Sequence, residues 1–327
     1  MKDNATRLYE SAIVIDGLII SKWSGPLFAE MQKAGLTAAN CTCSVWENFS
    51  ETVANIAQWN GWFREHGDHI VKATSVADIR NAKAAGKTAV ILGMQNTSAF
   101  EDKISYVEIL KTLGVGIAQM TYNTQNWVGS GCYESRDSGL SDFGHDVVAE
   151  MNRVGMLCDL SHVGPKTSRD VIDASTAPVA YSHCLPSGLK THPRNKSDEE
   201  LRYIVEKGGF VGVTMFPPFL AKGVNADISD YVAAMDYVIN LVGEDAVGIG
   251  TDFTQDYGPD FFDWLNHDKG FGRKLTSFGE IINPEGFRLV RDFPNIADAM
   301  SRAGWGDAKI EKVLGLNWLA LLDRVWR

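Results

Sequence analysis

Short apolar runs alternate with amphipathic segments along most of the chain. The apolar runs are rich in Val, Ile and Ala and show little polar alternation, which is typical of strands covered on both faces, as in a parallel sheet. We expect eight such strands, over residues 12–17, 37–45, 88–93, 115–121, 154–160, 178–182, 209–215 and 246–251.

The segments between these runs carry recognisable helix starts. Ser75 is followed three residues later by Asp78, and Ser197 by Glu200. In such pairs each side chain accepts a hydrogen bond from a backbone N–H group at the start of the helix, so both pairs predict a helix N-terminus. Strands and helices that alternate eight times over about 300 residues are typical of one α/β architecture, the (β/α)8 or TIM barrel. We therefore predict this fold.

We expect residues 1–327 to form a single barrel domain, because no linker rich in Pro, Ser or Gly and no low-complexity segment interrupts the pattern. Residues 253–294 are the exception to the alternation and form a long aromatic-rich stretch after the last expected strand. A long insertion after a barrel strand usually covers the active site. The alternative is a satellite cluster that packs only on the barrel wall.

The net charge narrows the range of partners. The chain has 31 Lys and Arg against 41 Asp and Glu, a formal net charge of −10. Such an acidic surface argues against nucleic acid or an anionic membrane as a partner. No run of about 18 apolar residues is present, so no segment is expected to span a membrane. Residues 1–11 are polar and lack the apolar core of a secretion signal, which favours the cytoplasm.

The five cysteines are odd in number and contain no CxxC motif. We therefore expect reduced, mostly buried thiols, as is usual for free cysteines. A soft-metal pair formed by Cys41 and Cys43 is the weaker alternative, because two cysteines alone seldom complete a site.

Polar side chains gather where the expected strands end, and the active site of such a barrel lies at the carboxyl ends of its strands. His162 follows the fifth expected strand, His183 the sixth and Asp252 the eighth. Neutral imidazole is a good zinc ligand and a carboxylate can take the proton of a bound water, so the three residues predict a hydrolytic metal site. The alternative is a hydrogen-bonded polar cluster that fills the barrel mouth.

Five segments carry a resemblance to a known family. They are GLSDFGHDVVAEMNRVGMLCDLSHVG (139–164), APVAYSHC (177–184), THPRN (191–195), AVGIGTDF (246–253) and IEKVLGLNWLALLDRVW (310–326). In this order and spacing they resemble the membrane (renal) dipeptidase family, within the metal-dependent amidohydrolase-like barrels. The resemblance covers nearly the whole chain. Members of that family hydrolyse dipeptides, typically with two zinc ions bridged by a carboxylate.

The resemblance also indicates what this chain lacks. The family carries a metal-binding His and Asp after the first strand and a bridging Glu after the third. Leu18, Ile20 and Gln95 stand at these positions. Two aliphatic side chains offer a divalent cation no ligand, and an amide oxygen carries no charge with which to bridge two cations. We therefore expect the first metal site to be absent.

The second metal site keeps its family residues. The resemblance makes His162 and His183 the ligands of one divalent ion, most simply zinc, although the site could also lack a metal. Gln95, Asp252 or water could complete the coordination sphere. The resemblance gives Asp252 the proton transfers from the attacking water and to the leaving amine. Arg194 would pair with a substrate carboxylate as a bidentate anchor, the alternative being an ordinary ion pair between a loop and the surface.

The same resemblance assigns roles to three further residues. His192 accompanies Arg194 in the HPRN motif and would position the substrate. Tyr122 replaces a His that contacts the scissile carbonyl, and a phenol can donate a hydrogen bond to an oxyanion. Either Gln95 or Tyr122 would then polarise the carbonyl. Phe216 stands near a position where the family often has a Tyr, and we expect it to contact the substrate.

These residues support three hypotheses. The first is a dipeptidase-like hydrolase with one metal, acting on an amide or other C–N bond of a small, carboxylate-bearing, amino-acid-derived substrate; ordinary dipeptides would be poor substrates. The second is a metal-free enzyme with Asp252, His162 and His183 as acid and base. The third is a non-catalytic protein that binds a small carboxylate through Arg194. The family is commonly dimeric, so we expect a homodimer.

Overall fold

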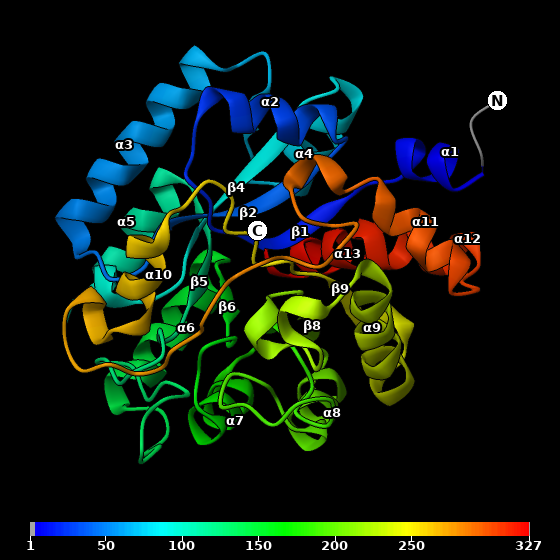
Figure 1. The fold of residues 1–327 in the computed structure, drawn as a ribbon. Coiled ribbons are helices and arrows are strands. Elements are labelled where there is room, and N and C mark those ends of the chain that lie inside the picture. Colours follow the sequence, from blue (N-terminus) through cyan, green and yellow to red (C-terminus); the bar gives the residue numbers. More distant parts are fainter. Residues whose placement is uncertain (1–3, 327) are drawn as a thin grey trace.

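Parallel strands form one sheet in the computed structural model, which describes residues 4–326 (Figure 1). The strands are β1 (Ile15–Ile19), β2 (Ala38–Ser44), β3 (Ile70–Lys72), β4 (Thr88–Met94), β5 (Val115–Gln119), β6 (Leu157–Asp159), β7 (Ala180–Cys184), β8 (Phe210–Val213) and β9 (Val247–Ile249). Eight of them lie side by side in the order β1-β2-β4-β5-β6-β7-β8-β9. β3 pairs with β4 outside this path.

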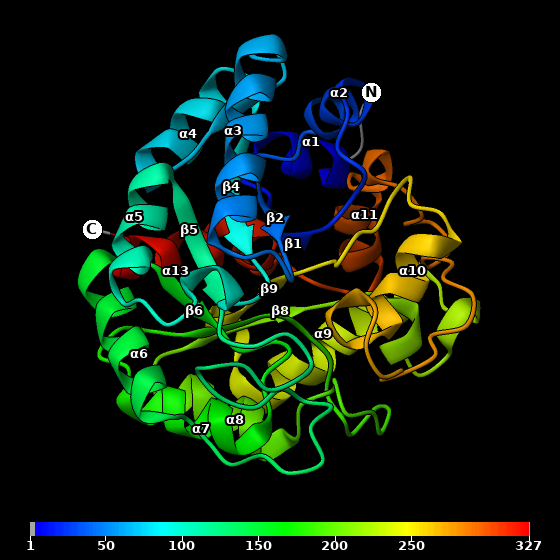
Figure 2. The same cartoon turned by 90° about the vertical axis from the view of Figure 1, so that its left-hand side faces the viewer.

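The two ends of the sheet meet and close the barrel. The backbone N–H of Asp252 donates to the Leu18 carbonyl over 3.0 Å, and that of Ile20 donates to the Phe253 carbonyl over 2.9 Å. These bonds join β1 to the chain just beyond β9, so the eight strands form a nearly closed barrel with helices around it (Figure 2). The predicted (β/α)8 fold is confirmed.

Each expected strand overlaps an observed one, but several ends differ. The range 12–17 begins too early, since β1 starts only at Ile15. The range 154–160 shrinks to the three residues of β6, because Val154 still belongs to a helix and Gly155 caps that helix with a left-handed φ of 72°. The short strand β3 was not predicted.

Helices cover the outside of the barrel and close one of its ends. They are α1 (Asn4–Ser11), α2 (Gly25–Lys33), α3 (Phe49–Glu65), α4 (Val76–Ala84), α5 (Ser105–Leu113), α6 (Asp142–Val154), α7 (Pro165–Ala174), α8 (Asp198–Glu206), α9 (Ile228–Val242), α10 (Pro259–Asn266), α11 (Asn295–Arg302), α12 (Asp307–Glu311) and α13 (Asn317–Val325). The helix starts predicted at Ser75 and Ser197 are confirmed as capping boxes of α4 and α8.

Helix α13 closes the end of the barrel where the strands begin. Trp318 of α13 packs in one buried cluster with Ile15 and Phe210, which start β1 and β8. Its indole Nε1 donates to the Ile249 carbonyl over 2.7 Å. A Cβ atom at Gly17 would lie 2.4 Å from the Trp318 ring, so only glycine leaves room for the indole. The carboxyl ends of the strands therefore remain for the functional site.

The segment 253–294 covers this other end of the barrel. It includes α10, whose Leu265 packs in a buried apolar cluster with Tyr122. Farther along, Phe278 packs edge-on against Phe216, with ring centroids 5.4 Å apart. Because both partners lie just beyond the strand ends, this segment packs against the barrel mouth.

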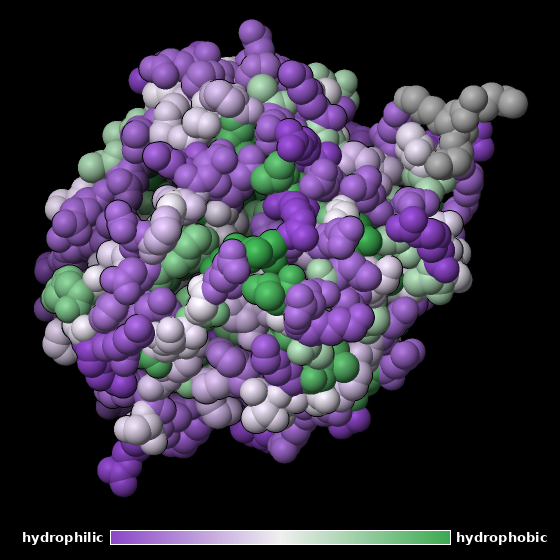
Figure 3. All heavy atoms as spheres, viewed as in Figure 1, coloured by the Kyte–Doolittle hydropathy of each residue, from purple (hydrophilic) through white to green (hydrophobic). Residues whose placement is uncertain are grey.

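The surface and the cysteines agree with the composition. The face in Figure 3 is mostly hydrophilic, with a small apolar patch near its centre. Within residues 4–326, no helix is long and apolar enough to cross a membrane. All five cysteines are free, and four of them are buried, as predicted. Cys41 and Cys43 lie in β2 and belong to no group of three or more potential metal ligands in the described chain.

Candidate active site at the carboxyl ends of the strands

The ends of β6, β7 and β9 bring three of the predicted residues into the barrel mouth. His162 follows β6, His183 lies in β7 and Asp252 follows β9. Their exposed fractions are 5%, 0% and 8%, so all three side chains are shielded from bulk water. Arg194, from the loop after β7, lies beside them and is 1% exposed.

The two imidazoles face each other. The Nε2 atoms of His162 and His183 lie 3.0 Å apart. Two nitrogen ligands of one tetrahedral zinc ion, each at about 2.05 Å, would lie about 3.3 Å apart. The observed separation is therefore close to the one that a shared metal ion requires.

The hydrogen bonds of His183 determine its tautomer. The Ser182 hydroxyl donates its single proton to Asp159 over 2.5 Å, so it can only accept from the Nδ1 atom of His183, 2.7 Å away. Nδ1 of His183 therefore carries the proton. In a neutral ring this leaves Nε2 with a bare lone pair, directed at the other imidazole.

The same argument applies to His162. Its Nδ1 atom lies 2.7 Å from the side-chain oxygen of Asn123, which can only accept. Burial, and secondly the charge of Arg194, hold the pKa of both histidines well below the ordinary value, so both rings are neutral. Two lone pairs then face each other at 3.0 Å and repel, unless a cation or a proton lies between them.

Asp252 has the properties of a base. It adopts a left-handed φ of 63°, and its backbone N–H bonds to β1, which fixes it at the barrel closure. Burial raises the pKa of its carboxyl to about 6, while the nearby Arg194 opposes this rise. A carboxyl with such a pKa is mostly ionised at neutral pH and still basic enough to accept a proton from water.

Arg194 is a buried cation whose partners are backbone carbonyl groups. Its guanidinium donates to the carbonyls of Ser161 and His183, and its Nε atom has no hydrogen-bond partner in the structure. Within residues 4–326 no carboxylate forms an ion pair with it, so the alternative of a loop-to-surface ion pair does not hold. A buried guanidinium without a carboxylate partner is a ready site for an anion.

His192 supports the Arg194 loop. Its Nδ1 accepts the backbone N–H of Arg194 over 3.1 Å, and its ring packs against Phe219 at 4.8 Å. Partial burial, followed by the charge of Arg194, lowers the pKa of His192 to about 4. The ring is therefore neutral. The Phe219 ring lies 5.2 Å from the Arg194 guanidinium, and Phe216, which is 3% exposed, packs on Phe219 as well. His192 and Phe216 thus support the wall that Phe219 forms beside the arginine.

The positions expected for the first metal are apolar. Leu18 and Ile20 are 1% and 6% exposed, and Ile20 lies in one buried cluster with Val45, Tyr122 and Leu265. We call this cluster (Ile20, Val45, Tyr122 and Leu265) the apolar plug. It occupies the part of the mouth where the first metal was expected to be missing.

Tyr122 is the member of the plug that contacts the histidines, and Gln95 is a second buried polar residue at the barrel mouth. The Gln95 side-chain N–H donates to Thr42 over 2.9 Å, and Gln95 is 2% exposed. The Tyr122 ring stacks on His162, with centroids 4.2 Å apart and planes at 24°, and its other neighbour is Trp46 at 4.8 Å. Burial raises the pKa of Tyr122 well above the ordinary value, so the phenol keeps its proton and can donate it in a hydrogen bond.

The residues present do not fit two metal ions, but they fit one. The described chain contains no group of three or more His, Cys, Asp and Glu side chains arranged to hold a metal. Two imidazole lone pairs that converge at 3.0 Å supply two ligands, and water and substrate would have to supply the others. Asp252 is not close enough to complete a three-residue group.

Three neighbours of the histidines had no role in the sequence analysis. Asn123 and Ser182 set the tautomers, and Asp159 holds Ser182. Asn123 and Asp159 stand next to predicted strand ends, which was a usable signal. Ser182 directly precedes His183 in sequence, but nothing in a sequence shows which way its hydroxyl points.

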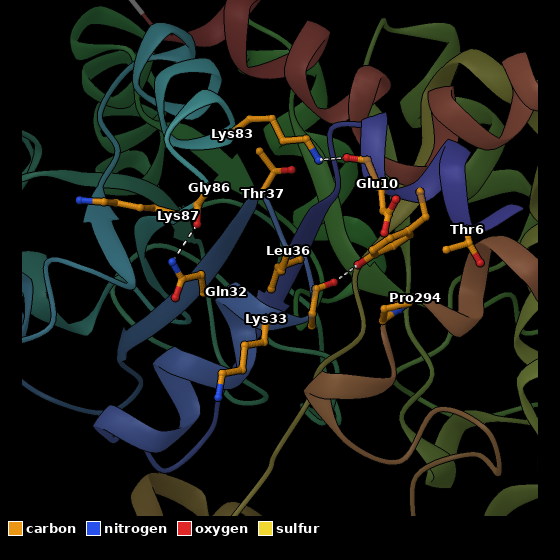
Figure 4. A pocket seen from close by; sticks show the side chains of 13 residues that line it. Thr6, Glu10, Gln32, Lys33, Leu36, Thr37, Lys83, Gly86, Lys87 and Pro294 are labelled. Carbon is orange, nitrogen blue, oxygen red and sulfur yellow. Dashed lines mark hydrogen bonds between the residues drawn. The ribbon is translucent and has the colours of Figure 1, made fainter. Parts of the chain in front are cut away.

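One cavity outside the barrel mouth is not the active site. It has a volume of about 320 Å³ and lies between α1, α2 and α4, where Leu36 and Lys87 lead into β2 and β4 (Figure 4). It is thus at the end where the strands begin, and none of the residues discussed above lines it. Catalytic groups of such barrels lie at the opposite end.

Barrels with imidazole ligands and a carboxylate at the carboxyl ends of the strands are typical of metal-dependent hydrolases. A model of the membrane dipeptidase family (peptidase family M19) matches residues 26–271. The chain therefore belongs to this family. The resemblance drawn from the five sequence segments is confirmed.

Individual relatives agree with this assignment. The chain is 34% identical to dipeptidase aclJ of Aspergillus oryzae over 264 residues, which is 79% of this chain and 57% of the relative. The crystal structure of an amidohydrolase from Pseudomonas aeruginosa is 60% identical, with a TM-score of 0.98, and the match covers 98% of this chain and 99% of the other. The probable dipeptidase PvdM from Pseudomonas aeruginosa shares the fold at 21% identity, with a TM-score of 0.82 and coverage of 98% and 97%.

The curated relatives are longer than the region that matches. Dipeptidase tcpJ of Claviceps purpurea is 28% identical over 263 residues, which cover 80% of this chain but 56% of the relative. The chain thus spans a little more than half the length of these two dipeptidases.

Proposed function

We propose that the protein hydrolyses an amide or other C–N bond in a small, amino-acid-derived substrate that carries a carboxylate, with one metal ion. The observation that carries the proposal is the pair of neutral imidazoles whose Nε2 lone pairs converge at 3.0 Å beside a buried Arg194 that forms no ion pair with a carboxylate of the described chain. The former fits a cation and the latter fits an anionic end of a substrate.

Each residue of the mouth has one task in this proposal. Arg194 binds the substrate carboxylate, and His192 and Phe216 hold the wall around it. Asp252 removes a proton from the attacking water and returns it to the leaving nitrogen, because its pKa lies near 6. The phenol of Tyr122 donates a hydrogen bond to the carbonyl oxygen as negative charge develops there.

His162 and His183 would hold the metal ion. When bound, a zinc ion polarises a carbonyl and lowers the pKa of water to about 7. Gln95 is a weaker candidate for the carbonyl contact, because its amide N–H is already bonded to Thr42. Ile20, Val45 and Leu265 of the apolar plug offer no ligand to a second ion, so a substrate amine that depends on a two-metal centre would bind poorly.

Metal content per chain is the test. We expect close to one equivalent of zinc by inductively coupled plasma mass spectrometry after reconstitution, and none in His183→Ala. A panel of N-acyl amino acids, dipeptides and cyclic amides should then give turnover that is lost in the same variant. A protein that binds no zinc, or a His183→Ala variant with full activity, contradicts the proposal.

A second candidate is a metal-free acid–base enzyme in which the same residues act. It is favoured by the observation that only two metal ligands converge in the described chain. In that case a proton shared between His162 and His183 would relieve the repulsion of their lone pairs. Turnover that survives exhaustive chelation supports this candidate, and turnover restored only by added metal rejects it.

The homodimer and the cytoplasmic location remain predictions. Light scattering coupled to size-exclusion chromatography measures the former, and fractionation of cells that express the protein measures the latter.

A further inference from the structure

A small pocket beside the apolar plug has six aromatic residues among the fourteen that line it. Its volume is about 160 Å³, and Ile20 and Val45 of the plug form part of its wall. The aromatic residues of the wall are Trp23, Trp59, Trp62, Tyr257, Phe261 and Trp264. We call it the aromatic pocket. It is distinct from the group formed by the two histidines, Asp252 and Arg194, none of which lines it.

The pocket contains one charged group, and that group is an anion. Glu47 is the only Asp, Glu, Lys or Arg among its lining residues. One carboxylate oxygen accepts the backbone N–H of Val45 over 2.6 Å, and the other accepts from the Asn55 side chain over 3.3 Å. These bonds hold the carboxylate in place, so its negative charge does not depend on a mobile side chain.

The rings surround the space from two sides. Trp59 and Trp62, both on α3, stand at 89° to each other with centroids 4.9 Å apart, and Trp23 meets Trp59 at 60° and 5.0 Å. These angles make a corner on this side, whereas on the other side Tyr257 and Phe261 stack on each other at 7° with centroids 3.5 Å apart. Phe261 and Trp264 come from α10, the helix that covers the barrel mouth. The faces of aromatic rings carry partial negative charge and attract cations, with Trp the strongest.

We propose that the aromatic pocket binds a methylated ammonium group of a small molecule. The wall and the carboxylate together select for positive charge, since the pocket holds no cationic residue. A primary ammonium needs three acceptors for its N–H groups, and each Glu47 oxygen already accepts one hydrogen bond, so the carboxylate by itself cannot satisfy all three. A quaternary or tertiary methylated ammonium needs few or none, and its methyl groups gain from contact with the rings.

The pocket is mechanically connected to the active site. Phe261 and Trp264 line the pocket, while Leu265 of the same helix packs on Tyr122, and Tyr122 stacks on His162. A ligand in the pocket would therefore hold α10 over the mouth. The binding itself needs neither a metal ion nor hydrolysis, so it goes beyond the proposed function and can be tested apart from it.

Calorimetric titration with choline and with its neutral isostere 3,3-dimethyl-1-butanol tests the proposal. The two probes have the same shape and differ only in charge. We expect saturable binding of choline and of tetramethylammonium, and at least about tenfold weaker binding of the alcohol, which corresponds to about 1.4 kcal/mol. Equal affinity for the alcohol, or no saturation with choline, overturns the proposal.

Variants locate the site. Glu47→Gln keeps an oxygen for the Val45 N–H but removes the charge, and it should weaken choline binding about tenfold while leaving the alcohol unchanged. Phe261→Leu should also weaken choline binding. Phe271→Leu is the matched control, because Phe271 lies in the same covering segment, is 84% exposed and does not line the pocket. Loss of affinity in Phe271→Leu as large as in Phe261→Leu contradicts the assignment.

Discussion

Two sides of the barrel mouth share one polar scaffold and differ in what it supports. On one side Asp16 accepts hydrogen bonds from the backbone and the hydroxyl of Thr251. On the other side Asp159 accepts the same two bonds from Ser182. Both aspartates are at most 1% exposed, so each needs these donors to remain buried.

The difference lies in the next side chain. On the Asp159 side, the Ser182 hydroxyl accepts a hydrogen bond from His183, whose imidazole faces His162. Beyond Asp16 come Leu18 and Ile20, which are buried among apolar side chains. The comparison teaches that the buried aspartates belong to the barrel itself. The chemistry of each side depends on the side chain next to the aspartate at the barrel mouth, which is His183 on the Asp159 side and Leu18 and Ile20 on the Asp16 side.

The largest expected effect is on turnover, in Asp252→Asn. If Asp252 is the base, its loss should lower kcat/KM by about 10²–10⁴. Wild-type kcat/KM should rise with pH up to a plateau above about 6, because only the ionised carboxylate accepts a proton. The pH–rate profile of both proteins measures this, and a variant that keeps the acidic limb near pH 6 contradicts the role.

The raised pKa of Asp252, which suits it to act as a base, lowers the free energy of unfolding at neutral pH. Because burial raises the pKa of Asp252 from 3.8 to about 6, the folded protein binds this proton more tightly than the unfolded chain does. The stabilising contribution is complete below about pH 4 and is lost as the pH rises through about 6. Relative to the wild type, Asp252→Asn should therefore gain up to about 3 kcal/mol between pH 4 and pH 8, measured by urea unfolding.

The next largest effect concerns the apolar side of the mouth. Ile20→Asp would place a carboxylate in the apolar plug and should lower the free energy of unfolding by about 3–5 kcal/mol. Ile20→Val is the control and should cost about 0.5–1.5 kcal/mol. Thermal unfolding with and without zinc distinguishes the cases. An Ile20→Asp protein of unchanged stability that gains a second zinc would show that the plug is no barrier to a first metal.

The smallest expected effect compares the two hydroxyls of the scaffold. Ser182→Ala removes the acceptor that fixes the His183 tautomer, and zinc affinity should fall about 10- to 100-fold. Thr251→Val removes the matching bond to Asp16, which touches no histidine, so it should affect stability and leave zinc affinity unchanged. Equal losses of affinity in a competitive zinc titration would mean that the scaffold acts as one unit.

The sequence predicted the barrel because its signals are local. Apolar runs and capping boxes such as Ser75 with Asp78 depend on neighbours a few residues away in the sequence. Eight strands that alternate with helices are compatible with few folds. β3 was missed because three residues carry too little pattern. The start of β6 was placed too early, because the helix before it continues up to Val154.

Residue identity alone determined that two aliphatic side chains and an amide stand where the family has first-metal ligands, and that His162, His183, Asp252 and Arg194 remain. Only the tertiary structure decided that the histidine Nε2 atoms converge at 3.0 Å and that Asp252 completes no three-ligand group. It also decided that α10 covers the mouth with an aromatic pocket beside it. The physical reason is that tautomers, lone-pair directions and raised pKa values arise from contacts between strand ends far apart in the chain.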